Sequence, residues 1–167
     1  MGKVIGFPQS PLAPFLGRWV LDPLSVSRNK AVKHALGEEG LKKLWGLASM
    51  EERAAYLAGD AELAARYASL RRTGNDSHLV VSPQTLTFMR PQMGVVEAKT
   101  SVFPVLRVSE EGRKAVVHTV NGPERGNHAI AYVLRFSKGW LLVSERYFGR
   151  AAQLFPRSPV HRYFAAE

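Results

Sequence analysis

The chain has 167 residues, of which 46% are hydrophobic and 22% charged, and its formal net charge is +9. A chain of this length buries enough surface for one sizeable core. Its mixed composition excludes a disordered tail, a collagen and a coiled coil. Because it contains no cysteine, disulfides, zinc–thiolate sites, iron–sulfur clusters and cysteine nucleophiles are also excluded.

The N-terminal residues 1–14 are predicted to form an extended arm. Pro8, Pro11 and Pro14 forbid a helix there and interrupt any apolar leader. No apolar run approaches the ~20 residues of a membrane-spanning helix. We therefore expect the protein either in the cytoplasm or outside it after removal of an export signal, and both compartments stay open.

One domain is predicted for residues 15–167, and it begins with a strand. The apolar run 15–21 is closed by Asp22 and Pro23, which is typical of a short first strand. A helical block follows over residues 27–72. The domain thus opens with a strand and continues with helices before most of its sheet.

Helix signals are clearest in the second half of the block. Ser49 and Glu52 form a capping box that begins a helix over 50–58. Asp60 is placed to cap a helix over 61–72. Apolar residues of that helix recur on one face: Leu63, Tyr67 and Leu70. An earlier apolar group is either a lid over the open end of a barrel or ordinary core: Leu41, Leu44, Trp45 and Leu47.

From residue 78 to 157 the hydrophobic pattern changes to period two. This pattern, with turns rich in Gly, Pro, Asn and Ser, predicts antiparallel strands. Pro104 marks a bulge, a bend or a break in the longest run. The predicted strands are 78–81, 85–90, 95–108, 114–120, 129–136, 140–148 and 151–155. The side chains predicted to face the interior are Val96, Val102, Tyr132, Leu134 and Trp140.

The first strand carries a family resemblance. Phe15-Leu16-Gly17-Arg18-Trp19 is similar to the Gly-x-Trp signal in the first strand of lipocalin-like (calycin) barrels. The chain resembles small bacterial lipocalin-like domains of unassigned function, which often close with an aromatic-x-Arg pattern like Phe155-Pro156-Arg157. The resemblance implies an α+β, mainly antiparallel barrel of about eight strands with a helical insertion after the first strand. It also implies that Trp19 packs across the closed bottom of the barrel and that Arg157 covers it.

A second fold has nearly the same order of elements. Helices followed by a curved antiparallel sheet are also found in the cone-shaped fold of scytalone dehydratase-like and polyketide cyclase-like proteins. The segment 136–143 looks like the hairpin near the end of such sheets. The strands after the helices are too numerous for that fold, so the cone is kept as the alternative.

Catalytic and metal signatures are sparse. The five histidines have no metal-ligand spacing, so neither a metal nor a cofactor is predicted. His118 shares a strand face with Val116 and Val120, which is typical of a hydrogen-bonded core histidine, with an acid/base role as the alternative. Glu145 is predicted to form a cross-strand ion pair. Nucleophile-elbow, P-loop and dinucleotide-binding patterns are absent from the sequence.

Basic residues gather in the last third of the chain. From Arg125 to Ala166 there are seven basic residues and the single acid Glu145. Arginines among aromatics favour an anionic small molecule or an acidic protein partner, unless they form only a solvated face. Nucleic acid is not favoured, because RNP-like and helix-turn-helix patterns are missing.

Three functions follow from this sequence. The first is a non-enzymatic binding protein for a small apolar or amphiphilic ligand with an acidic head group. The predicted interior residues would line the apolar tail, and Arg135 or Arg146 would meet the head. The second is an interaction protein that uses a basic face on an acidic partner. The third is a cone-fold enzyme with His118 as acid/base.

Overall fold

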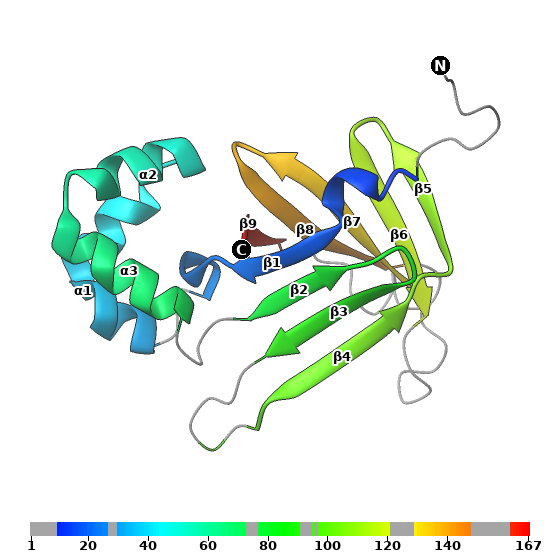
Figure 1. The fold of residues 1–167 in the computed structure, drawn as a ribbon, viewed down its shortest axis with the longest axis horizontal. Helices are drawn as coiled ribbons and strands as arrows, with labels where there is room; N and C mark the ends of the chain where they lie inside the picture. Colours follow the sequence, from blue (N-terminus) through cyan, green and yellow to red (C-terminus); the bar gives the residue numbers. More distant parts are fainter. Residues whose placement is uncertain are drawn as a thin grey trace.

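The computed structural model describes residues 10–26, 30–72, 77–90, 95, 97–120, 129–147 and 161–167. Within these ranges the chain forms three α-helices and one antiparallel sheet of nine strands, which confirms the α+β, mainly antiparallel class. Figure 1 shows the helices grouped beside one end of the sheet. In chain order the elements are the 3-10 helix η1 (Ala13–Phe15), β1 (Gly17–Leu21), the 3-10 helix η2 (Pro23–Val26), α1 (Lys30–Trp45), α2 (Met50–Ala58), α3 (Ala61–Arg72), β2 (His78–Val81), β3 (Thr85–Arg90), β4 (Lys99–Pro104), β5 (Arg107–Glu111), β6 (Lys114–Val120), β7 (Ala129–Ser137), β8 (Trp140–Tyr147) and β9 (His161–Ala166).

The helical block forms from the local signals in its sequence. The Ser49 side chain accepts a hydrogen bond from the Glu52 amide over 3.0 Å, and that of Asp60 accepts one from the Leu63 amide over 3.0 Å. Both predicted caps are confirmed. The block has its own hydrophobic core, made of Leu24, Val32, Leu36, Leu41, Leu44, Leu63, Tyr67 and Leu70.

The sheet has the strand order β4-β3-β2-β1-β9-β8-β7-β6-β5, with every neighbouring pair antiparallel. β1 lies inside the sheet rather than at an edge, because it pairs with β2 on one side and with the last strand of the chain, β9, on the other. Residues 104–107 carry the chain from one edge of the sheet to the other. The Val105 amide donates to Gln84 O over 2.8 Å, and the Leu106 amide donates to His118 O over 2.9 Å. Of the three alternatives expected at Pro104, the structure has the break, because β4 ends at this residue and β5 begins at Arg107. Because β4 does not pair with β5, the described sheet is not closed.

The two faces of the sheet carry different sets of side chains. We call the face that carries Tyr132 and Leu134 the inner face, and the face that carries Trp140 and Arg135 the outer face. Leu12 and Phe15, from η1 and the residue before it, pack on the inner face. The inner-face core is made of Leu21, Leu79, Val81, Leu86, Ala115, Val117, Tyr132, Leu134, Leu141, Val143 and Phe164.

Three details of the predicted strands are wrong. Phe15 lies in η1, so the first strand begins at Gly17. Val102 was expected inside but is 56% exposed, because Phe103 takes the inner position opposite Leu86. β9 was not predicted at all.

Some sequence predictions lie outside the described residues. They concern residues 1–9 of the predicted arm, Val96, Arg157 and the strand 151–155. In the described part of the arm the prediction of an extended segment is wrong, because Ala13 and Pro14 lie in η1, where proline is tolerated in the first turn.

Candidate functional site

A cavity of about 370 Å³ lies between the helical block and the outer face of the sheet. Small-molecule pockets typically enclose ~300–1,000 Å³. Its walls come from segments far apart in the chain: the end of β1 with η2, the link from α1 to α2, the β7–β8 hairpin and β9. The lining residues are Asp22, Leu24, Ser25, Trp45, Leu47, Ala48, Arg53, Ser137, Lys138, Trp140, His161 and Tyr163.

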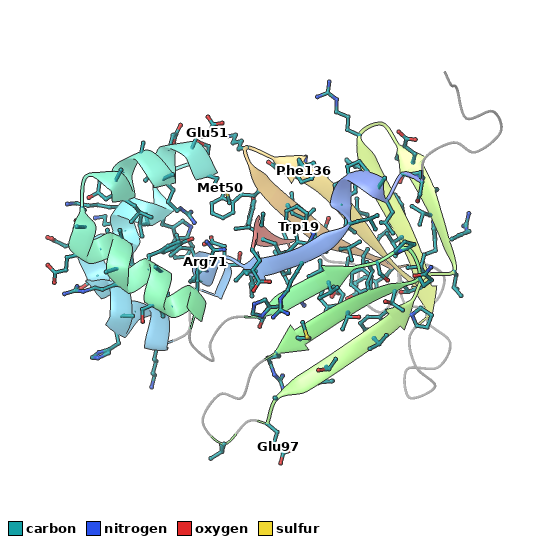
Figure 2. All side chains as sticks on the ribbon, viewed as in Figure 1. Trp19, Met50, Glu51, Arg71, Glu97 and Phe136 are labelled. Carbon is teal, nitrogen blue, oxygen red and sulfur yellow. The ribbon has the colours of Figure 1, made fainter. Side chains whose placement is uncertain are left out.

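The helical wall of this pocket is made by the end of α1 and the link to α2. Leu44 is completely buried in the helical core, whereas the next residue, Trp45, is 59% exposed and lines the pocket. The amide of Met50 donates to Lys138 O over 3.0 Å and so fixes the start of α2 on the β7–β8 hairpin. Figure 2 shows Met50 beside the tip of that hairpin.

The sheet wall begins at the β7–β8 turn. Lys138 (φ 51°) and Gly139 (φ 89°) both have positive φ, as two-residue hairpin turns require. The predicted Ser-Lys-Gly turn is confirmed. A Cβ on Gly139 would lie 3.0 Å from the Met50 Cβ, so this position needs glycine for space as well. The turn places Trp140 on the outer face, where its ring lies 6.3 Å from the Tyr163 ring at 77°.

The back of the pocket holds a buried polar network. Nη1 of Arg53 donates to Oδ2 of Asp22 over 2.8 Å, and the Tyr67 hydroxyl donates to Oδ1 of the same carboxylate. The side chains of Asp22 and Arg53 are 4% and 9% exposed. The guanidinium carbon of Arg53 also lies 4.6 Å from the centre of the Trp140 ring, within cation–π range. The network thus ties the end of β1, α2, α3 and β8 together.

Burial and charge shift the proton affinities in this network. Burial lowers the pKa of Arg53, but the charge and hydrogen bond of Asp22 outweigh it and raise the pKa overall. Burial, followed by the negative charge of Asp22, raises the pKa of the Tyr67 hydroxyl. Both groups therefore keep their protons, and both oxygens of Asp22 stay engaged.

The pocket is left with uncompensated positive charge. Asp22 is the only acidic residue among the described residues of the lining, and Arg53 neutralises it. Within the described part of the chain, neither Lys138 nor His161 forms an ion pair. Ser25 and Ser137 add hydroxyl groups. An anionic group on an apolar ligand fits this lining.

The site residues predicted from sequence are not brought together. Tyr132 and Leu134 are buried in the inner-face core, where the Tyr132 ring packs 5.1 Å from Phe88 and 5.5 Å from Phe103. Trp140 was expected beside them but lies on the opposite face, where it lines the pocket. The predicted period-two alternation is correct within β7 and within β8. The two-residue turn, however, pairs Trp140 with Ser137 on the outer face, whereas Leu141 pairs with Phe136 on the inner face.

The two predicted head-group arginines lie on the outer face, away from each other. Arg135 is exposed and pairs in register with Leu142, whereas Arg146 pairs with Ala131. These positions are four residues apart along the strands, or about 13 Å. Nη1 of Arg146 lies 2.5 Å from Oε2 of Glu111. The two arginines cannot contact the head group of a ligand held by Tyr132 and Leu134, because such a ligand would lie on the opposite face of the sheet.

Trp19 lies where the inner face meets η1. Its Nε1 donates to Phe15 O over 2.9 Å, and its half-buried ring is 6.0 Å from that of Phe136. Figure 2 shows Trp19 and Phe136 facing one another between β1 and β7. Trp19 therefore contributes to packing at this end of the sheet.

The remaining candidate residues have structural partners. Oε1 of Glu145 lies 3.6 Å from Nη2 of Arg162 on the neighbouring strand, which confirms the predicted ion pair. Nε2 of His118 lies 3.2 Å from the Ser109 hydroxyl, as expected for a hydrogen-bonded histidine. Burial, together with the charges of Arg107 and Arg146, lowers the pKa of His118. His118 does not line the pocket.

Sequence reasoning missed most of this site. From the sequence, Asp22 is predicted only to end a strand, and Arg53 is predicted only to lie in a helix. A signal was present, since an arginine on the buried side of a capped helix needs an acidic partner. Nothing in the sequence marks which carboxylate that partner is.

Comparison of the chain with protein-family models, with curated proteins and with solved structures finds no match. Among the described residues, no group of His, Asp and Glu side chains is arranged to hold a metal ion. The described helices also include none with the length and apolar character needed to cross a membrane.

Proposed function

We propose that this chain is a non-enzymatic binding protein for a small apolar or amphiphilic ligand with an acidic group. The observation that carries the proposal is the pocket between the helical block and the sheet. It combines aromatic walls with Lys138, which forms no ion pair with any described residue, and the one carboxylate of the described lining, Asp22, is already neutralised. Pockets for such ligands are mostly apolar and have few polar groups that fix the orientation.

The same network argues for binding rather than catalysis. Asp22 is the acidic residue of the described lining, and it accepts hydrogen bonds from Arg53 and Tyr67. A carboxylate held in this way is a poor general base, because the hydrogen bonds from Arg53 and Tyr67 occupy lone pairs on both of its oxygens. His118, the acid/base candidate, lies elsewhere, bonded to Ser109.

The fold suits a lipocalin-like interpretation, which we include in the proposal. Strands that follow one another along the chain are antiparallel neighbours in the sheet, except β4 and β5, and the last strand, β9, pairs with β1. Between β4 and β5 the chain passes directly from one edge of the sheet to the other. A barrel is completed if these two edges pair. The helical insertion after β1 then places the ligand outside the barrel rather than within it.

Binding of two matched fluorescent probes tests the proposal. Anilinonaphthalene sulfonate carries an acidic group, and N-phenylnaphthylamine has the same aromatic skeleton without it. The Lys138→Asn variant removes the charge and keeps a residue that tolerates positive φ. We expect it to weaken sulfonate binding about fivefold, as one Coulomb contact of about 1 kcal/mol implies, and to leave the uncharged probe unaffected.

Lys114→Asn is the matched control, because Lys114 is also exposed but lies at the start of β6, outside the pocket. It should bind both probes as the parent chain does. Near-UV circular dichroism checks that the packing of every variant is intact, since loosened proteins also bind this sulfonate. Equal weakening by both lysine variants, or no saturable binding, would contradict the proposal.

The second candidate function is recognition of an acidic protein partner. Exposed cations on and beside the outer face support it, among them Arg107, Arg113, Lys114 and Arg135. In that case affinity for an acidic polypeptide such as polyglutamate falls steeply with salt. Lys138→Asn and Lys114→Asn then weaken binding by similar amounts, which separates this function from the first.

A further inference from the structure

We infer that the apolar part of the ligand is a flat aromatic ring system with one negative charge, rather than an alkyl chain. This inference rests on the proposed function, since it concerns the same pocket. It follows from three features of the lining: the position of its rings, the small amount of aliphatic surface, and the number of unpaired charges.

Aromatic rings line both walls of the pocket. Trp45 comes from the end of α1, whereas Trp140 and Tyr163 come from the sheet. Trp45 is 59% exposed and Tyr163 is 39% exposed, so each has ring surface available to a ligand. Among the described aromatic residues, Trp45 makes no ring contact with another. An exposed indole at the mouth of a pocket is well placed to stack on a planar group.

The sheet wall is held in place before any ligand arrives. Trp140 is 4% exposed, with the Arg53 guanidinium 4.6 Å from its ring centre and the Tyr163 ring edge-on to it. Arg53 is itself fixed by the buried Asp22 carboxylate. A ligand ring therefore meets an ordered aromatic surface and orders few protein side chains on binding, which favours affinity.

Aliphatic surface is scarce by comparison. Among the described residues of the lining, only Leu24, Leu47 and Ala48 are aliphatic, and they lie at the helical side and in η2. An alkyl chain gains affinity in proportion to the apolar area that covers it, methylene by methylene. Three short side chains cover few methylenes, whereas the exposed rings of Trp45 and Tyr163 offer stacking and edge contacts to a flat ligand, with Trp140 packed behind Tyr163.

The charged lining residues without an ion-pair partner determine the charge expected of the ligand. Arg53 is neutralised by Asp22, which leaves Lys138 as the fully charged group without an ion-pair partner in the described lining. One carboxylate or sulfonate balances it.

Isothermal titration calorimetry with two carboxylates tests this inference. Naphthoate and undecanoate have the same number of carbon atoms and the same charged group, but one is flat and the other is a chain. We expect naphthoate to bind the parent chain at least about tenfold more tightly, a difference of about 1.4 kcal/mol. Trp45→Leu should weaken naphthoate binding about five- to tenfold and change undecanoate binding less than about twofold.

Phe136→Leu is the matched control, because Phe136 is 50% exposed but lies on the inner face of the sheet. It should bind naphthoate as the parent does. Undecanoate binding as tight as naphthoate, or a Trp45→Leu variant with unchanged naphthoate affinity, would overturn the aromatic assignment while leaving the proposed function in place. Failure of both carboxylates to bind would overturn the proposed function and this inference with it.

Discussion

The buried pair of Asp22 and Arg53 allows the sharpest test of the structure. Their side chains are 4% and 9% exposed, and the two charged atoms are 2.8 Å apart. In the Asp22→Asn variant the guanidinium stays buried without a counter-charge. Removing one partner of a buried pair typically costs about 3–5 kcal/mol, and the low exposure of both groups means that solvent does not reduce this figure. We expect a loss of that size in the free energy of unfolding.

A double-mutant cycle separates the pair from its surroundings. Urea denaturation of Asp22→Asn, Arg53→Met and the double variant measures the coupling energy, which we expect to be about 2–3 kcal/mol. Tyr67→Phe keeps the ion pair and removes one hydrogen bond to the carboxylate, so it should cost only about 1.5–3 kcal/mol.

The exposed pair of Arg146 and Glu111 is the control, because these side chains are 38% and 51% exposed. The cycle between Arg146→Met and Glu111→Gln should give a coupling of about 0–1 kcal/mol. A loss below about 1 kcal/mol in Asp22→Asn, with no coupling to Arg53, would refute the buried network and the docking of α2 on the sheet.

Two further predictions concern the sheet. Trp19→Ala should lower the free energy of unfolding by about 3 kcal/mol, the low end for a large aromatic, because its ring is half-buried against the core; an unmoved urea midpoint would contradict this packing. The folded-state pKa of His118 lies below its ordinary value of 6.5, so its neutral ring stabilises the fold above that pH. This stabilisation is lost as the pH falls through the folded-state pKa. Between about pH 7 and pH 5, the free energy of unfolding should therefore fall less in the His118→Gln variant than in the parent chain. An identical fall in the variant and the parent would contradict the lowered pKa of His118.

Local sequence determined the elements whose signals lie within a few residues of one another. Ser49 and Glu52 are three residues apart, and Asp60 caps the helix next to it, so the hydrogen bonds they form depend on local backbone alone. The period of β7 and the break at Pro104 are local in the same sense. The ion pair of Glu145 was predicted as a type of contact, but its partner Arg162 lies on a strand that the sequence did not reveal.

The tertiary structure decided the faces, the strand order and the pocket. Asp22 and Arg53 are 31 residues apart in the chain and meet only because α2 docks on the β7–β8 hairpin. Trp140 was found as a ligand-binding candidate, yet the turn at Lys138 and Gly139 places it on the face opposite Tyr132. Period-two alternation fixes which residues share a face within one strand, but not which face meets the helices. That choice depends on how separate elements bury their apolar surfaces against each other, and no local pattern encodes it.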